Sequence, residues 1–211
     1  MLKENYLSRM DLSRLCDKAE VELEVPGTVL LVLDMQDFFV SPDSHAFVPS
    51  APELVPAIQL LVKEFKHHGL PVIYTKHLNT RDNAEMMGRW WRDVITADNP
   101  LSRIHSGFDL SGSVIIEKTQ YDAFYRTELG SLLEQLRTTT VVITGVMTNL
   151  CCETTARAAF VRGLRVFMPV DGTAAMNMEL HKATTLNLSY GFSRPVCTAS
   201  IAESLRSSYG H

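Results

Sequence analysis

Three residues with complementary chemistry stand at the ends of apolar runs that are typical of buried strands. Asp34 and Lys118 each end such a run, and Cys151 follows a third run after a short turn. In open parallel α/β sheets, ligands bind at the carboxyl ends of the strands. A carboxylate, an ammonium and a thiol that meet at this edge could serve as base, electrostatic partner and nucleophile. Each alone has a commoner role, as a turn former, a solvated flank or a small buried hydrophobe, so only their convergence favours catalysis.

The position of Cys151 at the predicted start of a helix favours a nucleophilic thiolate. The positive end of the helix dipole and a nearby Lys118 would both lower the pKa of its thiol. Backbone N–H groups in the turn before the helix lack helical partners and could hold an oxyanion. Cys152 is turned about 100° from its neighbour, in line with small residues such as Ala156, and is expected to be buried and inert.

Apolar runs alternate with amphipathic segments along most of the chain. Apolar strands flanked by helices on both sides predict a parallel sheet wrapped by helices, an α/β fold. The predicted strands cover 28–34, 70–76, 113–118, 140–146, 164–170 and 194–198, and the predicted helices cover 51–69, 127–137, 151–163 and 178–191.

Composition limits the class of protein. The chain has 211 residues, 45% hydrophobic and 21% charged, as in ordinary soluble domains. The length predicts one domain over 27–211, preceded by a polar N-terminal arm or helix over 1–26. The net charge of −4 supplies no basic field, which argues against nucleic-acid binding.

The beginning of the chain and its cysteines favour a cytoplasmic location. Residues 1–6 lack the apolar segment of a signal peptide, and the apolar run over 29–33 is too short to span a bilayer, so no membrane association is expected. The cysteines do not form the pattern of a small secreted disulfide framework, and we expect reduced thiols. They are Cys16, Cys151, Cys152 and Cys197.

Three segments together resemble the isochorismatase-like cysteine hydrolases, a family that includes isochorismatases, nicotinamidases and N-carbamoylsarcosine amidase. The segments read LVLDMQDFF around Asp34, EKTQYDAF around Lys118 and GVMTNLCCETTARAA around Cys151, and the resemblance covers 28–200. It implies a three-layer α-β-α sandwich with a six-stranded, mostly parallel, Rossmann-like sheet. It also implies a homo-oligomer, a dimer or a tetramer.

The resemblance assigns roles to these residues. It implies that Asp34 is the acid and base, Lys118 the electrostatic partner and Cys151 the nucleophile. The backbone N–H groups of Met147 and Cys151 would form the oxyanion hole, and a cis peptide bond would precede Met147.

The chain departs from the nicotinamidase pattern at the end of the second predicted strand. Nicotinamidases carry an Asp-x-His metal pair there, whereas this chain has only His77 within YTKHLN. Asp43 and His45 form another such pair, but they follow the first strand and do not match the family's position. One histidine and scattered carboxylates make a poor metal site. We therefore expect no metal and no other cofactor, and we expect nicotinamide to be disfavoured as the substrate.

The cysteine decides between two reaction classes. The run DMQDFFV looks most like the siderophore-type isochorismatases, which break a vinyl ether by protonation and carry no nucleophilic cysteine at the aligned place. A thiolate has no use in that reaction, but it can open a C–N bond through a thioester. Cys151 therefore favours hydrolysis of a small amide or carbamoyl substrate. Ether hydrolysis with Cys151 as a bystander, or a non-catalytic binding module on the same fold, are the alternatives.

Candidate residues for a substrate pocket lie near the same edge of the predicted sheet. Each has a structural alternative: the tryptophans could anchor a long loop, the aromatic residues after Lys118 could pack in the core, and the histidine could be a polar rim residue or a lone ligand. The candidates are Phe39, His77, Trp90, Trp91, Tyr121 and Phe124.

Overall fold

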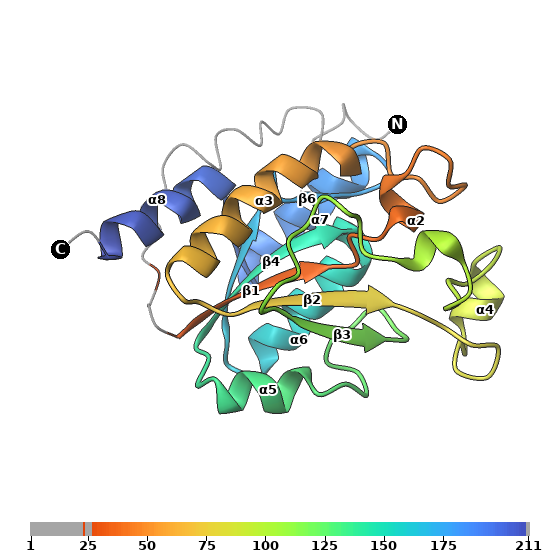
Figure 1. Ribbon diagram of the computed structural model, residues 1–211, viewed down its shortest axis with the longest axis horizontal. Coiled ribbons are helices and arrows are strands. Elements are labelled where there is room, and N and C mark those ends of the chain that lie inside the picture. The colour runs from red at the N-terminus through yellow and green to blue at the C-terminus, as the bar shows by residue number, and fades with distance from the viewer. Residues whose placement is uncertain (1–22, 24–26, 210–211) are drawn as a thin grey trace, which may run out of the picture.

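A parallel sheet forms the centre of the computed structural model, which describes residues 23 and 27–209 (Figure 1). Its main strands lie in the order β3-β2-β1-β4-β5-β7, and the two-residue strand β6 pairs with the end of β4. All six predicted strands are present within two residues of their expected ends. The strands are β1 (Thr28–Leu33), β2 (Val72–His77), β3 (Val114–Lys118), β4 (Thr140–Val146), β5 (Arg165–Pro169), β6 (Thr173–Ala174) and β7 (Arg194–Val196).

Helices cover both faces of the sheet, which confirms the predicted three-layer fold (Figure 1). Helices α3 (Ala51–His67) and α8 (Thr198–Tyr209) pack on one face. Helices α5 (Leu129–Gln135), α6 (Glu153–Val161) and α7 (Met178–Gly191) pack on the other. The remaining helical segments are short and lie in the connections: α2 (Asp37–Val40), α4 (Met87–Trp90), η2 (Pro100–Ser102) and η3 (Thr148–Cys152).

The alternation of side chains along β1 shows why its sequence is apolar throughout. Leu30 and Val32 point into the core under α3 and α8, whereas Leu31 and Leu33 point into the core under α5 and α6. Every residue of β1 and of β4 is buried. A strand covered on both faces needs apolar residues at all positions.

Helix α8 was not predicted, because its apolar pattern is sparse. Only Ile201, Ala202 and Leu205 anchor it to the sheet, within an otherwise polar segment.

The topology also defines the place of a site. Strand β2 follows β1 on one side and β4 lies on the other, so the chain reverses direction across the sheet between β1 and β4. Ligands bind at such a switch point.

Some expectations about the chain ends and its surface can be compared with the structure. The arm predicted over 1–26 lies outside the described residues except for Leu23, which is buried. Cys197 is disulfide-bonded, so the expectation of four reduced thiols is wrong there, whereas Cys151 and Cys152 are free. Pairing depends on which Cα atoms the fold brings close, and sequence spacing did not reveal it.

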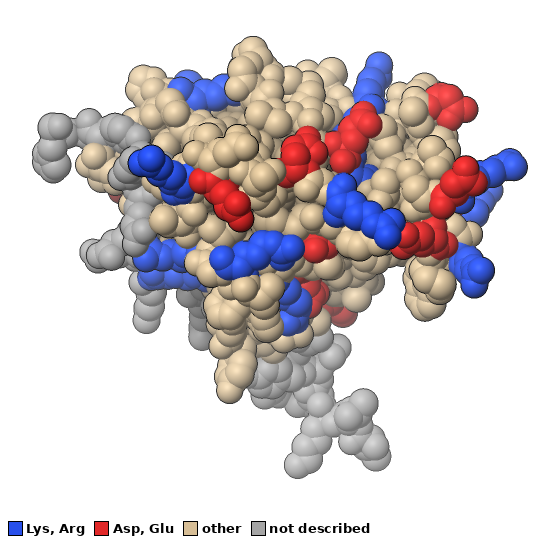
Figure 2. Space-filling view, turned by 90° about the horizontal axis from the view of Figure 1, so that it is seen from below, with Lys and Arg blue, Asp and Glu red and all other residues tan. Residues whose placement is uncertain are grey.

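Charged side chains of both signs are interspersed on the face seen in Figure 2. This distribution is in line with the small net charge of −4. Among the described residues, none of the helices is both long and apolar enough to cross a membrane.

Candidate active site

The carboxylate of Asp34 is held at the end of β1 by a threonine of the neighbouring strand. Asp34 adopts a left-handed backbone conformation with φ 53°, which aspartate tolerates better than most residues. Its N–H group donates to Thr75 Oγ1 at 3.1 Å, and the Thr75 hydroxyl donates to Asp34 Oδ1 at 2.6 Å. Both side chains are buried. One carboxylate oxygen is therefore committed to Thr75, and Oδ2 is left to face the rest of the site.

A close approach of two strands shapes the turn that carries the thiol. Gly145 has φ 110°, and a Cβ atom added there would lie 2.0 Å from the carbonyl oxygen of Leu33. Only glycine allows β4 to run this close to the end of β1. The peptide bond between Val146 and Met147 is cis, as the family resemblance implied.

Cys151 lies in a turn of π-helix, η3, rather than at the start of a regular α-helix. Helix α6 begins at Glu153, later than the predicted start at 151. The carbonyl group of Met147 accepts hydrogen bonds from the N–H groups of Leu150 and Cys152 at 3.0 and 3.2 Å. On the outer side of the turn, Thr148 Oγ1 lies 2.8 Å from Nδ1 of the buried His181 in α7. The nucleophile turn is thus tied to the helix behind it.

The three residues predicted from strand ends do converge. Lys118 ends β3 and its side chain reaches beneath β2, so that Nζ lies 2.8 Å from Asp34 Oδ2. The same Nζ donates to Cys151 Sγ at 3.3 Å and to the carbonyl oxygen of Gln120 at 2.9 Å. Asp34, Lys118 and Cys151 are all buried. A carboxylate, an ammonium and a thiol therefore share one desolvated site.

Burial and mutual interaction set the charge of each group. Burial would raise the pKa of Asp34, but the charge of Lys118 and a hydrogen bond from Cys151 hold it below its ordinary value. Burial would lower the pKa of Lys118, but Asp34 and Cys151 hold it above its ordinary value. The resting site at neutral pH contains a carboxylate and an ammonium.

The thiol of Cys151 is protonated in this resting site, which corrects the prediction of a thiolate. Burial raises the pKa of Cys151 to about 12, and the attraction of Lys118 does not offset it because Asp34 acts in the opposite direction. Burial also raises the pKa of Cys152 well above its ordinary value. Cys152 packs in the core with Ala156, as the predicted orientation required. Cys151 therefore needs a base before it can attack, and Asp34 is beside it.

A cavity of about 190 Å³ opens onto Cys151. Four of the predicted pocket residues line it: Phe39, His77, Trp91 and Tyr121. The indole N–H of Trp91 donates to the Tyr121 hydroxyl at 2.8 Å, which joins the loop after β2 to the loop after β3. The sequence did not indicate several further lining residues, because they come from irregular loops. These include His45, Asn79, Ile95 and Met176.

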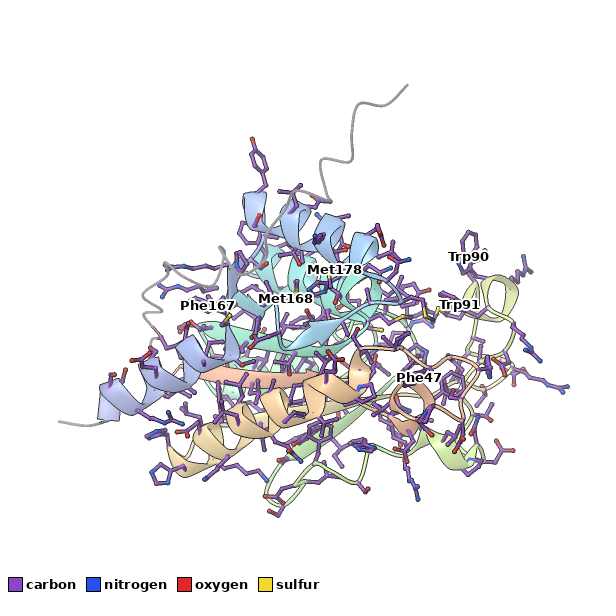
Figure 3. All side chains as sticks on the ribbon, turned by 90° about the horizontal axis from the view of Figure 1, so that it is seen from above. Phe47, Trp90, Trp91, Phe167, Met168 and Met178 are labelled. Carbon is purple, nitrogen blue, oxygen red and sulfur yellow. The ribbon has the colours of Figure 1, made fainter. Side chains whose placement is uncertain are left out.

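Two of the predicted pocket residues do not line this cavity. Trp90 is 75% exposed and projects from the outer side of the α4 segment, whereas Trp91 is 40% exposed (Figure 3). Consecutive residues of a helical turn point in different directions, so the two indoles could not both face inward. Phe124 is buried in the core with Leu129 and Leu133 of α5, below the cavity.

Among the described residues, the donor atoms of Asp34, His77 and Cys151 all lie within 4.8 Å of one another, as a metal site would require. The ammonium of Lys118 lies among them, 2.8 Å from Asp34 Oδ2, 3.2 Å from His77 Nδ1 and 3.3 Å from Cys151 Sγ. It takes the place of a cation, and a metal would also need Cys151 deprotonated. These residues do not fit a metal ion while Lys118 is charged.

A carboxylate, an ammonium and a free thiol at the switch point of a parallel sheet define a class of α/β cysteine hydrolase. Residues 28–200 match the isochorismatase domain. The chain belongs to the isochorismatase family, and it is a hydrolase of that family.

Individual relatives differ in their named activities. The chain is 38% identical to nicotinamidase 3 of Arabidopsis thaliana over 168 residues, which cover 77% of this chain and 81% of the relative. It is 28% identical to enterobactin synthase component B of Escherichia coli K12, covering 78% of this chain and 59% of that longer protein. The crystal structure of a cysteine hydrolase from Pseudomonas syringae pv. phaseolicola superimposes with a TM-score of 0.85 at 25% identity, covering 92% of this chain and all of that one.

Proposed function

We propose that this protein hydrolyses the C–N bond of a small amide or carbamoyl compound through a thioester on Cys151. The observation that carries the proposal is the position of the Cys151 sulfur. Cys151 lines the cavity, and its sulfur lies within 4.8 Å of a carboxylate oxygen of Asp34. A nucleophile with its base behind it and a cavity before it suits attack on a bound carbonyl group.

The first half of the reaction forms the thioester. Asp34 takes the proton of the Cys151 thiol, and the sulfur attacks the carbonyl carbon of the substrate. The carbonyl electrons move to oxygen, which the N–H groups of Met147 and Cys151 would hold as an oxyanion. The tetrahedral intermediate collapses, the C–N bond breaks, and the leaving amine receives the proton from Asp34.

The second half of the reaction regenerates the thiol. A water molecule enters after the amine leaves, and Asp34 takes one of its protons as the oxygen attacks the thioester carbonyl. The second tetrahedral intermediate expels the Cys151 sulfur, which recovers a proton from Asp34. The products are a carboxylic acid, or a carbamic acid, and ammonia or an amine.

Lys118 balances the charges that move during these steps. When Asp34 is protonated, the negative charge passes to sulfur, and Nζ already lies 3.3 Å from it. In a desolvated site this preset ammonium acts without reorganisation. The resting charges of Asp34 and Lys118 fit this assignment, and the protonated thiol requires the base.

The cavity favours a small and largely apolar substrate. A cavity of about 190 Å³ is smaller than the roughly 300–1,000 Å³ of pockets that bind drug-sized ligands. Phe39, Trp91 and Tyr121 supply aromatic walls, which suit an aromatic carboxamide. The sequence argument against nicotinamide depended on a missing metal pair, which bears on metal binding rather than on the ring. With a nicotinamidase at 38% identity, nicotinamide is the first substrate to test.

An ammonia-release assay tests the proposal. The panel contains nicotinamide, benzamide, an N-carbamoyl amino acid and, as the rival substrate, isochorismate. We expect ammonia from at least one amide or carbamoyl compound, no activity in Cys151→Ala, and retained activity in the matched Cys152→Ala variant. Cleavage of isochorismate alone, with full activity in Cys151→Ala, would replace the proposal with vinyl ether hydrolysis. Absence of turnover on every compound would favour a binding module.

A further inference from the structure

We propose that His77 is a positioning residue, whose neutral imidazole accepts a hydrogen bond from Lys118 and thereby weakens the hold of Lys118 on Asp34, the base that takes the proton of Cys151. This inference rests on the proposed function, because it concerns the base of that reaction. It gives His77 a role that differs from contact with substrate or metal.

The strand register places His77 beside Lys118. The two residues are paired at the ends of β2 and β3. His77 Nδ1 lies 3.2 Å from Lys118 Nζ, and His77 Nε2 lies 2.8 Å from Asn79 Oδ1. His77 is 5% exposed and Asn79 is 3% exposed. Both ring nitrogens of His77 thus have protein partners, so neither is left to bind a ligand.

The hydrogen bonds of Asn79 fix which ring nitrogen carries the proton. Asn79 Nδ2 donates to the carbonyl oxygen of Thr119 at 3.0 Å and to Asn83 Oδ1 at 3.3 Å. The amide oxygen of Asn79 therefore faces His77, and an oxygen of this kind can only accept. Nε2 of His77 must carry the proton, which leaves a lone pair on Nδ1 for the ammonium of Lys118.

The backbone of His77 is fixed from the other side. Its N–H group donates to Gln36 Oε1 at 2.7 Å, and Gln36 Nε2 donates to its carbonyl oxygen at 3.1 Å. The same Gln36 Nε2 donates to the carbonyl oxygen of Ser102 at 2.7 Å. A buried glutamine therefore holds the end of β2 in place, and with it the backbone from which the imidazole reaches Lys118.

The charged groups that face His77 keep it neutral. Burial and the positive charge of Lys118 lower the pKa of His77 to about 4, against the weaker opposing effects of Asp34 and Asn79. A protonated ring would direct an N–H group at an ammonium. At neutral pH the ring is therefore an acceptor for Lys118 and adds no charge to the site.

The three N–H groups of Lys118 face four acceptors. Nζ lies 2.8 Å from Asp34 Oδ2, 2.9 Å from the carbonyl oxygen of Gln120, 3.2 Å from His77 Nδ1 and 3.3 Å from Cys151 Sγ. Asp34 therefore shares the ammonium with the other acceptors, and His77 is one of them. Asp34 also interacts with the thiol of Cys151, whose proton it can take.

Removal of the acceptor at position 77 should strengthen the hold of Lys118 on Asp34. One N–H group of Lys118 would lose its partner and would be directed at Asp34 Oδ2, which already lies 2.8 Å from Nζ. That bond would stabilise the carboxylate, weaken Asp34 as a base and compete with the thiol for the same lone pair.

Alkylation of Cys151 by iodoacetamide measures this effect without any substrate. The rate is followed over a range of pH and assigned to Cys151 by peptide mass spectrometry. We expect His77→Leu to slow alkylation at mildly alkaline pH by about tenfold, the effect of one pKa unit, and to move the pH midpoint upward. Because the readout needs no turnover, it remains decisive if the amide panel fails.

Replacement of His77 by asparagine or by glutamine provides a matched pair of variants. His77→Asn places an amide oxygen near the position of Nδ1 and should keep the alkylation rate within about threefold of wild type. His77→Gln carries the same group one methylene further, near Nε2, and should be as slow as His77→Leu. With an active substrate, kcat should follow the alkylation rates while KM stays within about threefold, since both ring nitrogens of His77 are bonded to protein groups and are not available for a polar contact with the substrate.

Other results would overturn the inference. Equal alkylation rates in all three variants and wild type would show that His77 does not act on Cys151. A rise in KM without a fall in kcat would make His77 a substrate contact, and loss of wild-type activity on chelation, restored by a metal, would make it a ligand. Should a His77 variant fail to fold, Asn79→Leu provides a second test, because loss of the fixed tautomer should slow alkylation by at least threefold.

Discussion

Replacement of Lys118 by methionine should destabilise the protein through the carboxylate it leaves behind. Lys118 Nζ lies 2.8 Å from Asp34 Oδ2, and neither side chain has exposed surface. Methionine keeps the apolar stem and removes the charge. Removal of one partner of a buried ion pair costs about 3–5 kcal/mol, because the other charge is left uncompensated. We expect this loss in the free energy of unfolding at neutral pH, measured by urea denaturation followed by circular dichroism.

The pH dependence of this loss should identify its cause. Without Lys118, burial raises the pKa of Asp34 above the ordinary value of 3.8 in the unfolded chain. The folded variant then binds the proton more tightly than the unfolded chain does. The deficit should be complete above the raised pKa and should shrink as the pH falls through it towards 3.8.

A double variant completes the test. In Asp34→Asn/Lys118→Met both charges are removed, and residue 34 can still accept a hydrogen bond from the Thr75 hydroxyl. Replacing both members of a buried pair is far less costly than removing one. We expect the double variant to be more stable than Lys118→Met by about 2 kcal/mol, because it leaves no uncompensated buried charge. A double variant no more stable than Lys118→Met, or a deficit that does not change with pH, would refute this reasoning.

Three further predictions follow from the site. The pKa of His77 is 6.5 in the unfolded chain and about 4 in the folded protein, so acidification from pH 6.5 to about 4 should lower the free energy of unfolding by about 3 kcal/mol. His77→Asn should abolish this component of the pH profile measured by urea denaturation. Thr148→Val removes the partner that lies 2.8 Å from Nδ1 of the buried His181, and it should lower the free energy of unfolding by about 1–3 kcal/mol in the same assay. A loss below about 0.5 kcal/mol would contradict this prediction. Trp91→Phe removes the bond to Tyr121 and should raise KM about fivefold with little change in kcat, whereas a larger effect on kcat would contradict a role in the pocket wall.

The triad could be predicted because its placement follows from topology. Asp34 and Lys118 stand at strand ends, and parallel strands bring their carboxyl ends to one edge wherever the intervening loops run. The orientation of Cys152 followed from helical periodicity in the same way. These inferences needed only the period of the elements and their order.

The charge states could not be predicted, since they depend on three-dimensional burial. The expected thiolate at Cys151 assumed an exposed helix terminus, whereas the thiol lies in a buried turn beside Asp34. The role proposed for His77 likewise depends on Asn79, which lies two residues further on and whose amide orientation is set by Thr119. Trp90 was misplaced because a sequence does not give the rotation of a short helical turn within a loop.

The central claim is a covalent thioester on Cys151, and its direct test is mass spectrometry of enzyme quenched with acid during turnover. The amide that releases ammonia most rapidly is the substrate, and the quenched chain is digested and its peptides mapped. The account predicts a mass increase equal to the acyl group on the peptide that contains Cys151, absent from Cys151→Ala and still present in Cys152→Ala. An acyl group on another residue, or turnover in Cys151→Ala at the wild-type rate, would contradict the account.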